Sequence, residues 1–296
     1  MQSRVPALQR LILNSLPVDS RDRAIWLSAS GDHTGAGFAM IPHTGELRML
    51  DSAFQNTACS RMGIALPFLA GLFNCGLCKK VLHDEIGGHA LTCTGIAKTA
   101  RHNIIVRALA DELSAPLSHT GAHVDRQHAT YCLHGLIPKQ PIMLAHRDIA
   151  THAADIAITE AGRRTVLIDP TVTTPTVTPS EVNPARVPGF KAKAAEAKKE
   201  EKLQERFLVP DLLLAVVEFV PFGIESYGRL GAKAEAFIVA VARRAYPPVP
   251  LDSGGEWDVD GRMSIYVGRL RARVQVALAK GNDVMFEKFR LACPRR

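Results

Sequence analysis

The sequence lacks a long apolar run. No stretch approaches the roughly 18 to 20 uncharged residues that a membrane-spanning helix needs. Near the N-terminus, Arg4, Pro6 and Arg10 interrupt the chain before the apolar core of a signal peptide could form. An internal repeat is also missing. The sequence pattern therefore argues against a membrane-spanning or secreted protein, and it predicts a soluble, globular, intracellular one.

Acidic residues are fewer than basic ones. The 296 residues include 36 Lys and Arg against 29 Asp and Glu, which gives a net charge of +7. The apolar share of 47% is enough to bury a core in a chain of this length. A basic balance makes nucleic acid the first partner to consider, although many basic proteins never bind a polynucleotide.

Cysteine is scarce, but its distribution is uneven. Three of the six cysteines lie in the stretch 75–93, whereas Cys59, Cys132 and Cys293 stand alone. In a reducing compartment, clustered cysteines indicate a metal site rather than disulfides. The three isolated cysteines are therefore predicted to be free thiols.

The clustered residues follow the pattern Cys75-x2-Cys78-x10-His89-x3-Cys93. A C-x2-C turn supplies two thiolates from one knuckle, and H-x3-C supplies two ligands from one helical turn, which together suit tetrahedral zinc. Four protein ligands leave no open position for water, so the predicted zinc is structural. His83 is an alternative ligand with poorer spacing, and chance cysteines beside a core histidine are the competing interpretation.

Apolar periodicity predicts the regular elements further along the chain. Residues 98–115 show helical spacing, and the apolar runs 154–160 and 164–172 flank a turn, as in a β-hairpin. Residues 116–150 are predicted to form loops with one short strand, and 54–73 a helical stretch ending near Pro67. The other predicted elements are a charged helix over 191–207, a buried strand over 212–226 in the same sheet, and closing helices over 231–246 and 262–283.

The hairpin carries a second candidate site. Asp155 begins its first strand and Asp169 ends its second, so an antiparallel pairing would bring both carboxylates to one end of the sheet. Two hard oxygen ligands at one place suit Mg²⁺, and lysines of the following helix could stabilise a phosphate. The competing interpretation is that strand-end aspartates are turn or cap residues and that a Lys/Glu helix is a solvated face.

Taken together, these elements resemble the C-terminal region of non-LTR retrotransposon reverse transcriptases of the site-specific, restriction-like-endonuclease type, over roughly residues 20–290. In that family a CCHC zinc knuckle precedes a nuclease of the PD-(D/E)XK fold. The matching segments, in order, are the knuckle, "RHN" from Arg101, "ADIAI" with Asp155, "LIDPTV" with Asp169, "KKEEK" with Lys199 and Lys202, and "FVPFGIESYGRLG" with Glu225.

The resemblance implies roles for these residues. Asp155 and Asp169 would bind the catalytic metal, and Lys199 or Lys202 would replace the lysine that usually lies two residues beyond the second acid, where this chain has Thr171. The residues expected to contact nucleic acid are Arg101, His102, Arg269, Arg271 and Arg273.

Several departures from the family pattern accompany these matches. Ala154 stands where proline is common, and Leu203 stands where a tyrosine follows KxxK. The family's additional upstream acid could be Asp125 or Glu112. No Y-x-D-D polymerase signature is present, so we expect a chain that cuts but does not copy, a detached C-terminal piece of a retroelement reading frame.

The predicted fold class is therefore α/β (α+β), with a small zinc knuckle followed by a restriction-endonuclease-like mixed sheet flanked by helices. The expected divisions are a helical N-terminal region over 1–70, the knuckle over 71–100, the nuclease core over 101–250 and a basic helical segment over 251–296.

Two hypotheses of function follow. The first is a nuclear, Mg²⁺-dependent DNA endonuclease with structural zinc, with element RNA as an additional partner. The second is a non-catalytic nucleic-acid-binding remnant. A separate interpretation gathers several loop residues into a second metal site, namely His119, His123, His128, Cys132 and His134.

Overall fold

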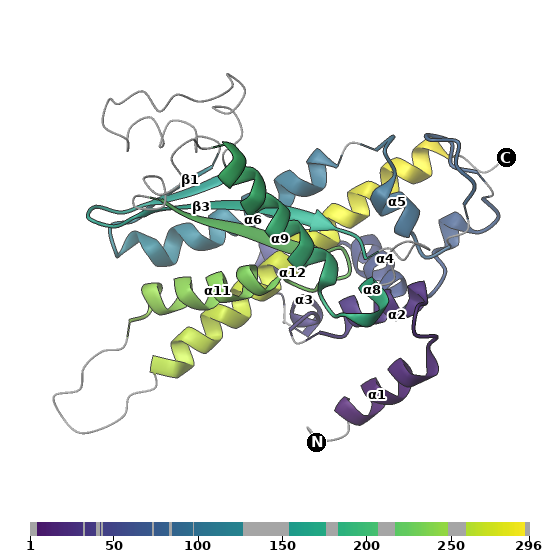
Figure 1. The fold of residues 1–296 in the computed structure, drawn as a ribbon, viewed down its shortest axis with the longest axis horizontal. Coiled ribbons are helices and arrows are strands. Elements are labelled where there is room, and N and C mark those ends of the chain that lie inside the picture. The colour runs from purple at the N-terminus through teal and green to yellow at the C-terminus, as the bar shows by residue number, and fades with distance from the viewer. Residues whose placement is uncertain are drawn as a thin grey trace.

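A computed structural model describes residues 5–31, 33–39, 42, 44–72, 74–82, 85–96, 98–126, 154–175, 183–206, 217–247 and 259–293 (Figure 1). It contains a mixed sheet and helices on both of its faces, so the α+β part of the prediction is confirmed. None of the helices in these ranges is both long and apolar enough to span a membrane.

The sheet has the strand order β1-β2-β3-β4, and its strands are β1 His123–Arg126, β2 Ile156–Thr159, β3 Thr165–Thr173 and β4 Val217–Glu225. The pairs β1–β2 and β2–β3 are antiparallel, which confirms the predicted hairpin. β4 runs parallel to β3 and is largely buried, as its apolar run predicts. β1 is the short strand expected between 116 and 150; the rest of that segment, from 127, lies outside the described residues.

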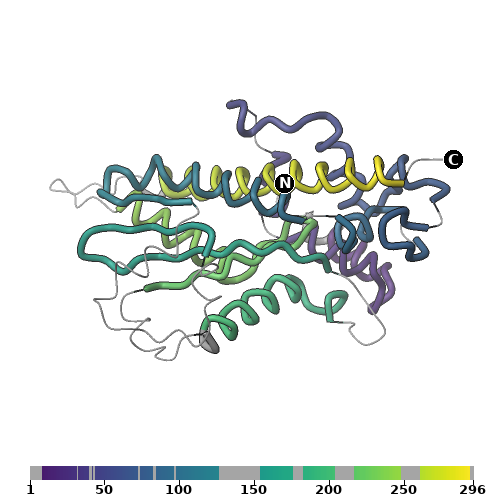
Figure 2. Tube along the Cα trace, turned by 90° about the horizontal axis from the view of Figure 1, so that it is seen from above, coloured from purple at the N-terminus to yellow at the C-terminus, as the bar shows by residue number. Residues whose placement is uncertain are grey.

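Helices cover the sheet on two sides. α9 Phe190–Arg206 lies against β3 and β4 on one face, and α6 Thr99–Ser118 and α11 Ala232–Ala245 lie on the other (Figure 2). α12 Val259–Ala292 packs along α6 as an outer layer. Apolar side chains of α6, α11, α12 and the sheet form one large buried cluster, which includes Leu109, Ile168 and Leu270.

The last helix is longer than its sequence pattern predicts. It was expected to end near residue 283, but α12 continues to Ala292. This extra length carries Phe286 and Phe289 into a second buried cluster with residues of the 75–93 stretch, such as Leu91. The burial of both rings gives the additional turns a packing energy that helical propensity alone does not provide.

The remaining helices are shorter than α12, and α2 Arg21–Ala29 and α5 Gly88–Thr92 contribute buried residues to the second cluster. α4 begins at Asp51 and ends at Met62, because Gly63 adopts φ +70° and stops it before the predicted end near Pro67. The other elements in this part are α1 Val5–Ser15, α3 Ala36–Ala39 and α8 Asn183–Arg186, with 3-10 turns at Gly45–Leu47 and Pro67–Leu69.

Candidate functional site

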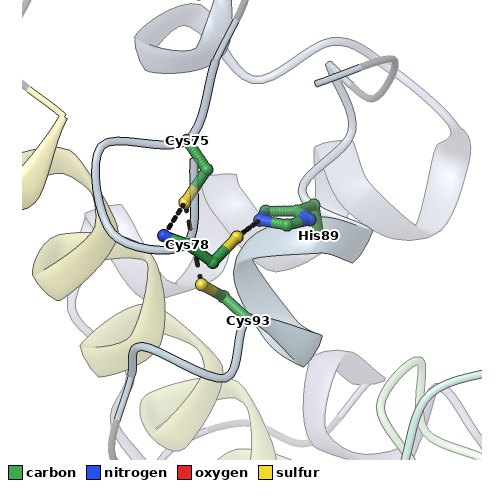
Figure 3. Close-up of side chains that lie close together, drawn as sticks. All are labelled: Cys75, Cys78, His89 and Cys93. Carbon is green, nitrogen blue, oxygen red and sulfur yellow. Dashed lines mark hydrogen bonds between the residues drawn. The ribbon is translucent and has the colours of Figure 1, made fainter. Parts of the chain in front are cut away.

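The cysteine–histidine pattern closes into one cluster. Cys75 and Cys78 come from a tight turn, His89 from the helix α5, and Cys93 from the residue that ends it. Their side chains point into a common space (Figure 3), and one ligand atom of each lies within 4.8 Å of all the others. His83, the alternative ligand, lies outside the described residues.

The spacing of these ligand atoms fits tetrahedral zinc. The Cys75 and Cys93 sulfurs are 3.7 Å apart, and Cys78 Sγ lies 3.4 Å from His89 Nε2. Two thiolates bound to one tetrahedral zinc at about 2.3 Å each are about 3.8 Å apart. The cluster could therefore accept zinc with little movement, and its soft donor set favours that metal over Mg²⁺.

The thiols differ in acidity before any metal binds. Burial disfavours the Cys75 thiolate, but hydrogen bonds from the backbone of Cys78 and from His89 outweigh it and lower the pKa of Cys75 to about 6. Burial and the neighbouring thiols raise the pKa of Cys93 to about 11. Zinc binding would therefore release a proton from Cys93 at neutral pH.

Cys293, predicted to be an isolated thiol, lies beside this cluster. The amide of Gly76 donates a hydrogen bond to Cys293 Sγ at 3.0 Å. A side chain at Gly76 would collide with the carbonyl oxygen of Ala292, so the C-terminal end of α12 lies directly on the knuckle turn. No spacing signal could have revealed this contact, because the two segments are about 200 residues apart.

The two hairpin aspartates also meet, as predicted. The amide of Asp155, the residue before β2, donates to the carbonyl of Ile168 in β3, and the carboxyl groups of Asp155 and Asp169 contact each other. The Asp169 side chain is 10% exposed and that of Asp155 is 33% exposed.

Each aspartate has a basic partner on a different helix. Lys199 Nζ of α9 donates to Asp169 Oδ2 at 2.6 Å, and His102 Nε2 of α6 lies 3.1 Å from Asp155 Oδ1. Lys202 is exposed and has no hydrogen bond or ion pair within the described part of the chain. Of the two candidate lysines, Lys199 is thus the one at the carboxylates.

The surroundings shift the pKa values of the two carboxyl groups in opposite directions. Burial raises the pKa of Asp169, an effect that Lys199 opposes and the Asp155 carboxylate reinforces. Burial also acts on Asp155, but the hydrogen bond and charge of His102 dominate and lower its pKa. In return, Asp155 raises the pKa of His102. Two adjacent carboxyl groups with opposite pKa shifts are a frequent feature of functional sites.

These groups line a cleft of about 1140 Å³ between α6 and the end of the hairpin. Its walls also include Asp125, Arg107 and Arg126, so the cleft carries charges of both signs. Of the two candidates for the additional acid, Asp125 lines the cleft. Glu112 does not; its carboxylate is buried and pairs with Arg269 at 2.6 Å.

Glu225 caps the N-terminus of α9. Its Oε1 accepts hydrogen bonds from the amides of Lys191 at 3.1 Å and Ala192 at 3.5 Å, at the N-terminus of α9. Burial raises its pKa despite these bonds. Glu225 thus satisfies the first free amides of the helix that carries Lys199.

Several residues predicted to contact nucleic acid are turned inward. Arg101 is 3% exposed and donates to Asn282 Oδ1 at 3.2 Å and to the carbonyl of Leu91 at 3.5 Å. Arg273 is 9% exposed, and Arg271 pairs with Glu235 at 2.7 Å. This burial leaves the side chains of Arg101 and Arg273 little surface for contact with a phosphate. Arg269 is half-exposed but bound to Glu112, and His102 lies in the cleft.

The second metal site is not assembled from the residues that can be described. His119 Nε2 lies 3.1 Å from the carbonyl oxygen of Ala245, and His123 lines the cleft that contains Asp155 and Asp169. The remaining candidates, His128, Cys132 and His134, fall outside the described residues.

The chain was compared with known proteins on three levels. No protein-family model, no curated protein and no solved structure matches it.

Proposed function

We propose that this protein is a divalent-metal-dependent DNA endonuclease of the restriction-like type, as its resemblance to the nuclease region of non-LTR retrotransposon proteins implies. The observation that carries the proposal is the meeting of Asp155, Asp169 and Lys199 in one open cleft. These residues come from a strand start, a strand interior and a separate helix, and they are the three to which the resemblance gives catalytic roles.

The carboxylates would hold the catalytic metal. Mg²⁺ prefers hard oxygen ligands and keeps several waters, and two adjacent carboxylates at an open cleft provide such a partial shell. When bound, Mg²⁺ would polarise the phosphodiester and make a coordinated water a stronger nucleophile. His102 holds one oxygen of Asp155 and Lys199 holds one oxygen of Asp169, and the two carboxyl groups also contact each other.

Lys199 would have two tasks. Its contact with Asp169 Oδ2 orients that carboxylate, and its side chain is one-third exposed and lines the cleft. A fixed cation near the reacting phosphate stabilises the negative charge that develops in the transition state. Lys199 thus takes the part of the displaced lysine in the family pattern.

The basic residues that remain available for DNA differ from those that the sequence indicated. Arg107 is exposed, lines the cleft and has no ion-pair partner among the described residues. Arg126 also lines the cleft but pairs with Asp111 at 3.2 Å. We propose that Arg107 contacts backbone phosphates beside the scissile bond, and that such contacts position DNA without reading its sequence.

The proposed zinc has a structural role. The knuckle packs against α12 through His89 and Phe289, whose ring centroids are 5.9 Å apart, and α12 packs against α6. Zinc would therefore stabilise the helices behind the cleft rather than take part in the reaction.

The test is a nicking assay on supercoiled plasmid. We expect the zinc-loaded protein to nick DNA with Mg²⁺, and Asp169→Asn to lower the rate by roughly a thousandfold or more, as removal of an electrostatic catalytic group does. Asp51→Asn, an exposed carboxylate in α4, is the matched control and should nick as the wild type does.

A different result would favour the second hypothesis. If the wild type and Asp169→Asn are equally inert while both bind DNA with a steep salt dependence, the protein is a non-catalytic binding module. If both nick equally, the activity does not come from this cleft.

A further inference from the structure

We infer that His102 is a positioning residue that fixes the Asp155 carboxylate for the divalent cation. The inference rests on the proposed function, because it concerns the same cleft. It changes the role of His102 from the phosphate contact that the sequence suggested to the support of a metal ligand.

The Asp155 side chain has a basic partner, His102, and it also contacts the Asp169 carboxyl group. Its main chain is fixed by the hydrogen bond from its amide to the carbonyl of Ile168, but its side chain stands at the open end of the hairpin and is one-third exposed. His102 Nε2, at 3.1 Å from Oδ1, is its ion-pair partner in the described part of the chain. Holding Oδ1 in this way restricts the orientation of the whole carboxylate, which contacts Asp169.

The two carboxylates are supported from two sides. Lys199 reaches Asp169 from α9, and His102 reaches Asp155 from α6, which packs on the opposite face of the sheet (Figure 2). Ligands that are held by hydrogen-bonding partners bind metals more tightly, because their orientation is set before the metal arrives. Lys199 alone would orient only one of the two ligands.

His102 itself is held by an unusually well-anchored helix turn. The preceding residue, Arg101, is buried and bonds to Asn282 of α12 and to the carbonyl of Leu91. A side chain at Gly281 would lie 2.6 Å from Arg101 Cγ, so the helices are in close contact here. Leu91 lies between the zinc-ligand candidates His89 and Cys93, which links the knuckle to the position of His102.

We take His102 to support the site rather than to complete its ligand set, because its Nε2 faces Asp155 Oδ1. Within the described residues, the knuckle has three or more ligand atoms close enough together to share a metal. His102, Asp155 and Asp169 do not form such a group of three. A neutral imidazole with a proton on Nε2 can donate to Oδ1 as an imidazolium does. The side-chain amide of a glutamine could donate the same hydrogen bond to Oδ1.

The experiment measures Mn²⁺ binding to the zinc-loaded protein, with free Mn²⁺ followed by electron paramagnetic resonance. The site is defined as the Mn²⁺ bound by the wild type and lost in Asp155→Asn/Asp169→Asn. We expect His102→Phe, which keeps a ring but loses the donor, to weaken this binding by roughly 10- to 100-fold. His102→Gln should restore most of the affinity, and Asn103→Ala, an exposed neighbour in α6, should bind as the wild type does.

A kinetic measurement separates positioning from a general structural effect. In the nicking assay, His102→Phe should need a higher Mg²⁺ concentration for half-maximal rate and approach the wild-type rate at saturation. Thermal unfolding of each variant checks folding, and His102→Ala replaces His102→Phe if the larger ring unfolds the protein.

The outcomes are distinct. If His102→Phe and His102→Ala bind Mn²⁺ as tightly as the wild type, this inference is wrong while the proposed nuclease stands. A His102→Gln variant that binds as weakly as His102→Phe also overturns it. If the wild type shows no Mn²⁺ binding that depends on Asp155 and Asp169, both the inference and the metal site of the proposed function fall.

Discussion

Lys199 and Lys202 lie on the same side of α9, three residues apart, yet they differ in their surroundings. Lys199 meets Asp169 at 2.6 Å, whereas Lys202 is exposed and does not line the cleft. The sequence offered both as the catalytic lysine, since either matches the KxxK pattern. At the scale of single residues, the partner of a charge decides its role.

This difference predicts unequal effects on nicking. We expect Lys199→Ala to lower the nicking rate by roughly 100- to 1,000-fold, because a cation aimed at the reacting phosphate is lost. Lys202→Ala removes an equal charge from the same helix and should change the rate only a few-fold. Single-turnover rates at saturating Mg²⁺ measure both, and equal losses would contradict the assignment of Lys199.

Glu225 allows a test at the residue scale that does not depend on the nuclease hypothesis. Glu225→Ala leaves the part-buried amide of Lys191 and the buried amide of Ala192 without this acceptor, which should lower the free energy of unfolding by roughly 1–3 kcal/mol. Glu225→Gln keeps an acceptor oxygen and should lose less. Urea unfolding at neutral pH compares the two variants.

The raised pKa of Glu225 gives this comparison a pH dependence. A carboxyl group whose pKa is higher in the folded state favours folding while it is protonated. Its contribution is lost as the pH rises from the ordinary glutamate pKa, about 4.3, through the folded value. Across this window the wild type should lose stability relative to Glu225→Gln, and a gain would contradict the assigned direction.

At the scale of elements, α6 joins the two halves of the molecule. In its first turn, Arg101 contacts α12 and the carbonyl of Leu91 in the knuckle. The next residue, His102, lines the cleft, and Leu109 and Leu113 of the later turns are buried in the core. An amphipathic pattern predicts such a helix but not which polar residues turn inward. Arg101 turns inward because α12 and Leu91 supply acceptors for its guanidinium.

The burial of Arg101 predicts a loss of stability rather than of DNA affinity. Burial lowers the pKa of Arg101 to about 10, and its removal leaves the acceptors on Leu91 and Asn282 unpaired, at roughly 1–3 kcal/mol each. We expect Arg101→Met to lower the melting temperature by several degrees.

Arg107→Met is the matched control, since it removes the same charge from an exposed position of the same helix. It should leave the melting temperature nearly unchanged and weaken DNA binding, with a smaller dependence of affinity on salt. The reverse pattern for the two variants would restore Arg101 as the phosphate contact.

At the scale of the whole molecule, α12 connects the knuckle with the core of the sheet. Its first half packs on α6 through Leu270 and Val274, and its second half carries Phe286 and Phe289 into the knuckle cluster. One continuous helix thus belongs to both hydrophobic clusters, and we expect a loss of order in one cluster to affect the other.

Removal of zinc should therefore destabilise more than the knuckle. We expect one zinc per chain by elemental analysis, and chelation or Cys75→Ser to cost several kcal/mol, which corresponds to roughly 10 °C in melting temperature. Hydrogen exchange should increase in the C-terminal half of α12 and at the start of α6. Cys59→Ser, outside the metal cluster, is the control, and a chelator without effect on either segment would contradict the zinc assignment.

The sequence by itself determined the elements that depend on neighbours along the chain. Helical periodicity fixed α6, the turn between two apolar runs fixed the β2–β3 hairpin, and ligand spacing fixed the Cys75–Cys93 cluster, all because their interactions span a few residues. The meeting of Asp155 and Asp169 followed from the same local pairing.

Only the tertiary structure decided what each charge and thiol contacts. The partner of Lys199 is 30 residues away, that of Arg101 is 181 residues away, and Cys293 reaches Gly76 across 217 residues. No short sequence motif spans such separations along the chain, because these contacts result from the packing of α6, α9 and α12 around the sheet. The sequence thus fixed which groups could form a site, and long-range packing selected His102, Asp155, Asp169 and Lys199 to line it.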